Sequence, residues 1–176
     1  MLARSSTAAL AGIEAYPVQV EVDLAPGLPA LVIVGLADAA VQESRERVRS
    51  ALRNSGLRLP LSRVVVSLAP ADRRKQGPSF DLPIALALAC ASGQLQPEQL
   101  EGIWCFGELG LDGQLRPIRG ALSIALAAHQ AGARALSARS GQQLLGVART
   151  IADLDGDAEV GTAAVAEALT YRSFAP

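Results

Sequence analysis

Two hydrophobic patterns predict the first strands of this chain. Residues 17–24, PVQVEVDL, place apolar side chains at every second position, which is typical of a half-buried strand. After a Pro-Gly turn, residues 30–34, ALVIV, predict a strand that returns beside it as a hairpin. Residues 3–10 predict an earlier strand.

A helical pattern follows over residues 39–54. Asp38 stands just before it, at the position where a side-chain oxygen can cap the helix, and Ser55-Gly56 ends it. The apolar positions recur every three or four residues and predict one buried face: Val41, Ser44, Val48, Ala51 and Leu52.

The centre of the chain joins two buried elements by a charged loop. Residues 63–69, RVVVSLA, predict a strand covered on both faces. Residues 82–90, LPIALALAC, are apolar all round, which predicts a helix inside the core. The segment between them, ADRRKQGPS, carries four charges. A loop held by two rigid elements is a common place for functional groups.

The remaining elements are shorter. Asp112-Gly113 between two apolar runs predicts a hairpin of strands 102–109 and 114–118. Further predictions are a helical turn at 96–101, a strand at 133–137, and helices at 120–130, 139–147 and 162–170. The predicted elements begin with strands and continue with βα units and hairpins. This order predicts an α+β fold with helices packed on a mixed sheet.

Length and composition narrow the class of protein. A chain of 176 residues with 50% hydrophobic residues can form one domain with a proper core. No apolar run is long enough to span a bilayer, and the N-terminus lacks a signal-peptide pattern. Cys90 and Cys105 have no metal-binding or redox spacing, so we expect buried free thiols in a cytoplasmic protein.

Charge is distributed unevenly. Residues 39–75 hold nine Arg or Lys against three acids, although the whole chain has a net charge of −1. A basic block in a near-neutral chain indicates an anionic partner or simply a solvated face. The candidates for contact with the nucleic-acid backbone are Arg73, Arg74 and Lys75 in the loop and Arg45, Arg49 and Arg53 on the helix.

Three sequence blocks carry a family resemblance: VGLADAAVQESRERVRSALRNSG, GPSFDLPIALAL and FGELGLDGQLRPIRGALSIALAAHQAG. The last two resemble the proteolytic domain of Lon. All three, in this order, resemble the N-terminal domain of the Mg-chelatase-like ComM (YifB) family. The resemblance implies a two-layer Lon-type fold, shared with a ribosomal-protein domain and containing a left-handed crossover. The resemblance covers roughly residues 1–135. We expect one domain over residues 1–171, followed by a tail or linker at 172–176.

The resemblance also identifies the position of a catalytic dyad. Lon-type proteases use a serine and a lysine base; Ser79 stands at the serine position, but Leu122 stands at the lysine position. Leucine cannot accept a proton, so we expect no catalytic site. Lys75 is the only lysine, and its charged loop predicts neither burial nor a lowered pKa. The favoured role of Ser79 is a helix N-cap, with Asp81 near the positive end of the helix.

Members of the resembled family are hexameric AAA+ helicases of DNA recombination and natural transformation. The resemblance therefore implies a non-catalytic N-terminal domain that assists ring assembly and guides DNA. This chain has no GxxxxGK[ST] and no metal-ligand spacing, so ATP and Mg²⁺ are expected in an AAA+ domain outside it. Two alternatives stay open: an oligomerisation module whose arginines pair with acids on a neighbour, and a serine peptidase acting through Ser79.

Overall fold

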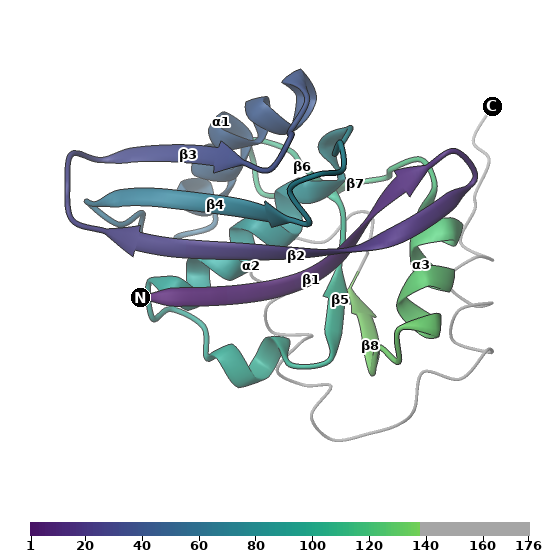
Figure 1. Ribbon diagram of the computed structural model, residues 1–176. Coiled ribbons are helices and arrows are strands. Elements are labelled where there is room, and N and C mark those ends of the chain that lie inside the picture. The colour runs from purple at the N-terminus through teal and green to yellow at the C-terminus, as the bar shows by residue number, and fades with distance from the viewer. Residues whose placement is uncertain (138–176) are drawn as a thin grey trace.

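The computed structural model describes residues 1–137, and these form a mixed α+β unit (Figure 1). The elements in chain order are β1 (Leu2–Ala11), β2 (Glu14–Ala25), β3 (Ala30–Val34), α1 (Ala39–Asn54), β4 (Arg63–Ala69), the 3-10 turn η1 (Pro78–Phe80), α2 (Asp81–Ala91), the 3-10 turn η2 (Pro97–Leu100), β5 (Ile103–Cys105), β6 (Glu108–Leu109), β7 (Leu115–Arg116), α3 (Ala121–Gln130) and β8 (Ala135–Ser137). The predicted α+β class and mixed sheet are confirmed. The predicted helices at 139–147 and 162–170 and the domain end at 171 lie outside the described residues.

Six strands form the main sheet in the order β3-β4-β2-β1-β5-β8. The pairs β1–β2 and β2–β4 are antiparallel, whereas β3–β4, β1–β5 and β5–β8 are parallel. β6 and β7 form a separate antiparallel pair, with Leu109 opposite Leu115. The hairpin predicted at Asp112-Gly113 is therefore confirmed for β6 and β7. The predicted strand 102–109 is divided, because β5 belongs to the main sheet and β6 does not.

The predicted hairpin between residues 17–24 and 30–34 is wrong. β4 lies between β2 and β3, and β3 pairs in parallel with β4. β4 pairs with β2 so that Val20 lies opposite Leu68 and Val22 opposite Val66, all buried. The hairpin of β2 is instead made with β1, in register from Leu2–Asp23 to Ala11–Glu14. A turn signal shows that the chain reverses, but a strand arriving later can take the adjacent position.

The main core lies between one face of this sheet and helices α1 and α2, and a smaller buried cluster joins α3 to Ala8 and Trp104. α1 and α2 lie on the same side of β1–β4 in Figure 1. All eleven residues of α2 are buried, as the uniformly apolar sequence predicts. β4 alternates instead: Val64 and Val66 are buried, whereas Val65 and Ser67 are only half-buried. The prediction of a strand covered on both faces is therefore wrong, because the side chains on the second face of β4 stay partly exposed.

α1 has the predicted bounds and the predicted buried face. Asp38 caps it: Oδ1 accepts a hydrogen bond from the Val41 N–H at 2.8 Å. Its Oδ2 accepts a second one, at 3.3 Å, from the N–H of Gly77. One carboxylate thus starts the helix and fixes the loop that precedes η1, so the charged loop and α1 are held together.

Candidate functional site

The charged loop between β4 and η1 runs beside the N-terminus of α1. Lys75 N–H donates to the carbonyl of Leu36 at 3.1 Å, and Asp38 N–H donates to the carbonyl of Lys75 at 3.0 Å. These contacts fix the charged loop beside the residues that begin α1. The main chain of the loop is therefore well fixed, although most of its side chains are exposed.

Lys75 is buried, which corrects the expectation for this residue. Its side chain is 0% exposed, and Nζ donates to the carbonyl oxygen of Pro70 within the same loop. Burial lowers the pKa of Lys75, with Asp72 acting in the opposite direction. The main chain at Lys75 is hydrogen-bonded to Leu36 and Asp38, and the Lys75 side chain is enclosed within the loop. Lys75 therefore does not present its ammonium group on the surface.

Replacing Lys75 with methionine should test this burial. At pH 7 we expect a loss of no more than about 1 kcal/mol, the value of one hydrogen bond, because the replacement also removes a buried charge. With its lowered pKa, folded wild-type protein releases the lysine proton before the unfolded chain does. The wild type should therefore gain stability relative to Lys75→Met as pH rises toward 10.5. Urea unfolding of both proteins at pH 7, 9 and 10 measures this, and a constant difference would contradict it.

The two arginines of the loop differ from each other. The Arg73 guanidinium lies 3.5 Å from the centroid of the Tyr16 ring, and Tyr16 Oη donates to the carbonyl of Arg74 at 2.9 Å. Tyr16 is buried on β2, so Arg73 packs the loop onto the sheet by a cation–π contact. The Arg74 side chain is exposed and makes no hydrogen bond or ion pair within residues 1–137. Of the three predicted loop residues, Arg74 is the one whose side chain has no partner within residues 1–137.

The arginine stripe on α1 is present. Arg45 and Arg53 are exposed and Arg49 is half-buried. Arg45 Nε donates to the carbonyl of Gln42 at 2.9 Å, while Arg49 and Arg53 have no hydrogen-bond or ion-pair partner in the described part of the chain. Eight residues of helix span about 12 Å, so three cations without carboxylate partners lie along one edge of the helix.

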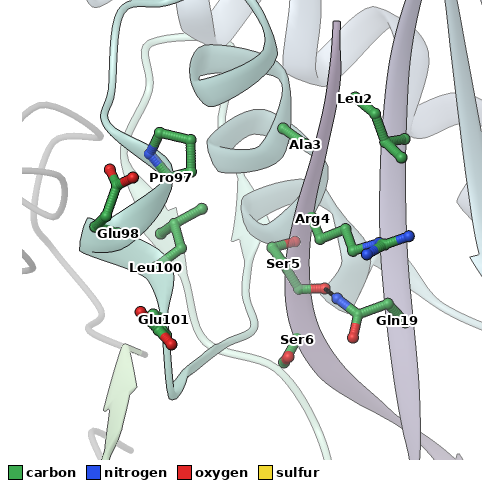
Figure 2. Close-up of a pocket in the computed structure, with 10 residues that line it drawn as sticks. All are labelled: Leu2, Ala3, Arg4, Ser5, Ser6, Gln19, Pro97, Glu98, Leu100 and Glu101. Atoms are coloured by element: carbon green, nitrogen blue, oxygen red, sulfur yellow. Dashed lines mark hydrogen bonds between the residues drawn. The ribbon is translucent and has the colours of Figure 1, made fainter.

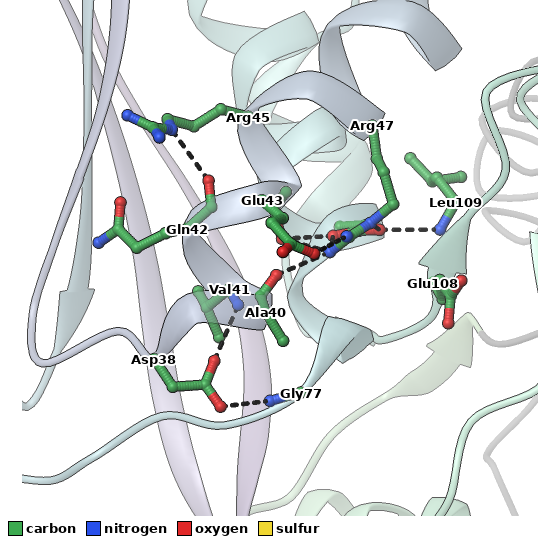
Figure 3. A network of polar contacts seen from close by, with 12 residues as sticks. Asp38, Ala40, Val41, Gln42, Glu43, Arg45, Arg47, Gly77, Glu108 and Leu109 are labelled. Atoms are coloured by element: carbon green, nitrogen blue, oxygen red, sulfur yellow. Dashed lines mark hydrogen bonds and ion pairs between the residues drawn. The ribbon is translucent and has the colours of Figure 1, made fainter.

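A buried ionic network joins α1, α2 and β6 (Figure 3). Asp81, the first residue of α2, is 0% exposed. Arg47 donates to both of its carboxylate oxygens, from Nε at 2.6 Å and from Nη2 at 3.1 Å. Ser44 Oγ and the N–H of Leu109, at 3.1 Å, also donate to this carboxylate. Burial raises the pKa of Asp81, and these donors oppose that rise.

Arg47 is the residue that the sequence analysis missed in this network. The helical pattern pairs it with Glu43 four residues earlier, and that ion pair exists at 3.5 Å. The stronger partner, Asp81, is 34 residues away. One signal could have found it: Arg47 follows the buried Ser44 by three positions, so it lies beside the buried face and not opposite it.

Ser79 does not cap a helix, which corrects the role favoured from the sequence. It is the middle residue of η1, and neither η1 nor α2 has a side-chain cap. Its carbonyl accepts from the N–H of Gly107 at 2.9 Å, but its hydroxyl makes no hydrogen bond with Lys75. Leu122, at the Lon lysine position, lies on α3 and is 43% exposed. The predicted position of Asp81 in the first turn of α2 is confirmed.

Within the described region, both cysteines are buried, and neither a metal-binding cluster nor a membrane-spanning helix is present. Within residues 1–137 no group of three or more His, Cys, Asp or Glu could hold a metal ion. Cys90 and Cys105 are buried free thiols, and burial raises the pKa of Cys90 to about 11. No helix within residues 1–137 has the length and apolar character to cross a membrane.

Comparison with known proteins places this architecture in a family. Residues 20–139 match the family described as subunit ChlI of Mg-chelatase, and residues 118–172 match the C-terminal part of subunit ChlI. The chain therefore belongs to the Mg-chelatase ChlI-like family that includes YifB and ComM.

Individual relatives agree with this. YifB of Escherichia coli K12 is 43% identical over 141 residues, covering 80% of this chain and 28% of that protein. The competence protein ComM of Haemophilus influenzae is 44% identical over 119 residues, covering 68% of this chain and 23% of that protein. Rv2897c of Mycobacterium tuberculosis is 42% identical over 131 residues, covering 74% and 26%. The chain thus spans about a quarter of the length of these relatives.

Proposed function

We propose that this chain provides the non-catalytic N-terminal domain of a ComM-type AAA+ DNA helicase. The domain assists ring assembly and guides DNA past its basic surface, formed by Arg45, Arg49, Arg53 and Arg74. The similarity to a competence protein supports the context. The main support for DNA contact is that none of these four arginines has a carboxylate partner among residues 1–137. Such a surface suits phosphate groups and does not read bases.

A Lon-type fold is part of this proposal. The three sequence blocks that resemble Lon and ComM map onto α1, η1–α2 and β6–α3. The Asp81 network joins all three, through Arg47 on α1 and the N–H of Leu109 on β6. Asn54 Nδ2 at the end of α1 also donates to the carbonyl of Leu111 at 2.7 Å. Segments that are far apart in the sequence thus form one packed unit.

The ATP-dependent chemistry is proposed to reside elsewhere. The 176 residues contain no P-loop, so ATP and Mg²⁺ would be bound by an AAA+ domain outside them. Members would assemble as a homo-oligomer, a hexamer by the family resemblance, in the cytoplasm. Sequencing the transcript beyond the codon for Pro176 tests the proposed location of the ATP site. The proposal expects a P-loop motif to be encoded there in the same reading frame.

DNA binding can be tested by removing the stripe on α1. The triple variant Arg45→Ala, Arg49→Ala, Arg53→Ala should weaken binding of fluorescent single-stranded and duplex DNA at 50 mM salt by at least about tenfold, or about 1.4 kcal/mol. Its slope of log K against log salt on duplex DNA should fall by about 2–3, because each lost phosphate contact removes about 0.9. A variant with Arg73 or Lys75 replaced is a poorer test, since these residues hold the loop.

A matched control removes the same charge from other places. Arg4→Ala, Arg116→Ala, Arg119→Ala also takes away three positive charges, and all three residues are exposed. It should leave DNA binding within about twofold if position matters more than net charge. Equal losses in both variants would show a nonspecific charge effect. Absence of binding by folded wild-type protein at low salt, in the monomer and in the full-length ring, would contradict the proposal.

One observation favours the oligomerisation module as the second candidate. Apolar side chains are exposed at the β1–β2 hairpin tip and on α3: Leu10 is 37%, Ile13 92%, Leu122 43% and Leu126 49% exposed. The two parts are in contact, since Ser123 Oγ donates to the carbonyl of Ile13 at 2.6 Å. Contiguous apolar surface of this kind commonly marks a protein interface. Concentration-dependent sedimentation together with absent DNA binding would favour this module.

A further inference from the structure

Strand β1 is fully paired on only one of its two sides. On one side all ten residues pair with β2. On the other side its parallel neighbour β5 pairs with it at a single position, Ser6 opposite Trp104. Within residues 1–137, no strand therefore lies beside residues 2–5 on that side. An unpaired strand edge offers main-chain donors and acceptors to an incoming strand.

A groove runs along this open edge (Figure 2). Its second wall is η2, because the chain before β5 leaves the plane of the sheet and forms a 3-10 turn in place of a longer strand. The cavity between the two walls has a volume of about 440 Å³. Four residues of extended chain cover about 13 Å at the usual rise of about 3.3 Å per residue. The groove is lined by residues 2–6 and by Gln19, Pro97, Glu98, Leu100 and Glu101.

The unpaired charges of the groove are negative. Glu98 and Glu101 are exposed, and neither carboxylate has an ion-pair partner in the described region. Arg4 is engaged by Glu21, with Nε 2.9 Å from Oε1. Arg134 Nη2 donates to the main-chain carbonyl of Glu101 at 3.0 Å, and this contact leaves the carboxylate available.

Apolar groups complete the surface between these charges. Leu2 at the start of β1 is 53% exposed, which is a large exposure for a leucine on a strand. Pro97 and the buried Leu100 line the opposite wall of the groove on η2 (Figure 2). A strand places successive side chains on opposite faces, so one occupant could offer an apolar group to the exposed Pro97 and cations to Glu98 and Glu101.

We propose that this groove binds an extended basic peptide segment of a partner protein. The segment adds as a strand to residues 2–5 of β1, where main-chain hydrogen bonds supply affinity. Lysine or arginine at alternate positions pairs with Glu98 and Glu101 and supplies the preference for a basic partner. This surface is distinct from the arginine stripe on α1, so it acts independently of DNA binding.

The test uses the full chain and a defined probe. The probe is a fluorescent, capped Lys-Val-Lys-Val-Lys-Val peptide, compared with Glu-Val-Glu-Val-Glu-Val. We expect the basic peptide to bind at low salt and the acidic one to bind at least tenfold more weakly. The double variant Glu98→Gln, Glu101→Gln should weaken binding of the basic peptide at least tenfold. The control Glu14→Gln, Glu46→Gln removes two exposed acids elsewhere and should leave binding unchanged.

A second measurement separates strand pairing from simple charge attraction. Methylation of alternate amide nitrogens of the basic peptide keeps its charge but removes its donors, and it should abolish binding. Peptide binding should also shift the amide NMR signals of residues 2–6 and leave those of α1 unchanged. The proposal is overturned if the methylated or acidic peptide binds equally well, or if the basic peptide does not bind to the folded protein. A groove already filled by this chain or by a second copy would give that last result.

Discussion

Arg47→Ala should lower the free energy of unfolding by about 3–5 kcal/mol, because it leaves a buried carboxylate without its cation. Asp81 is 0% exposed and receives two hydrogen bonds from Arg47. Ser44 and the N–H of Leu109 would then be its only donors among residues 1–137. Chemical denaturation of the variant and the wild type at pH 7 measures the loss. Arg49→Ala, on the same helix but without a partner, is the control and should stay within about 0.5 kcal/mol.

The loss should depend on pH in a defined direction. Burial already raises the pKa of Asp81, and removing Arg47 removes the main group that opposes this rise. Folded Arg47→Ala protein then holds the Asp81 proton more tightly than the unfolded chain, where an aspartate has a pKa of about 3.9. Its stability therefore increases as pH falls through the folded pKa. The deficit against wild type should be smaller at pH 5 than at pH 8.

A double variant tests whether the unpaired charge of Asp81 causes the loss of stability. Asp81→Asn in the Arg47→Ala background removes the buried charge while keeping a side chain of similar size. It should recover part of the stability lost in Arg47→Ala, since no uncompensated charge remains. A loss below about 1 kcal/mol for Arg47→Ala, or a deficit that does not change with pH, would show that Asp81 does not depend on this ion pair.

Gly35→Ala should be the second large effect, with a loss of about 2–5 kcal/mol. Gly35 directly follows β3 and has φ +106°, a conformation that costs other residues about 1–3 kcal/mol. A Cβ at this position would overlap the main-chain carbonyl of Leu68 on β4. Because that obstacle is backbone of a paired strand, the sheet must shift to admit the methyl group, which adds about 1–3 kcal/mol. Thermal and urea unfolding measure the loss.

Gly56→Ala is the matched control for this substitution. Gly56 also has a positive φ, +80°, but nothing lies within 4 Å of a Cβ built there. Only the cost of the positive φ applies to alanine at this position, so we expect the free energy of unfolding to fall by about 1–2 kcal/mol. If the two variants lose equal stability, the close approach of Gly35 to Leu68 carries no energetic weight. A larger loss for Gly35→Ala supports the β3–β4 contact described above.

Local patterns in the sequence determined the elements whose environment is set by their own residues. α1 has the predicted bounds and the predicted buried face, because helical periodicity and the Asp38 cap act within a few residues. α2 is buried all round because it has no polar face to expose. The coarse fold class and the family also follow from patterns of this kind.

Only the tertiary structure decided which strands pair and which charges are free. The insertion of β4 between β2 and β3 depends on the path of α1, which no turn signal records. The six candidate cations look alike in the sequence. Yet Lys75 is buried against Pro70, and Arg73 packs on Tyr16.

The physical reason is the range of the interactions. Periodicity, caps and turns are local, so residues near in the sequence reveal them. Burial and ion pairing depend on partners that folding supplies from far along the chain, as Arg47 and Asp81 show across 34 positions. The sequence by itself therefore determined the elements and the family. The tertiary structure decided the order of the strands, the buried ionic network and the arginines left free to meet a partner.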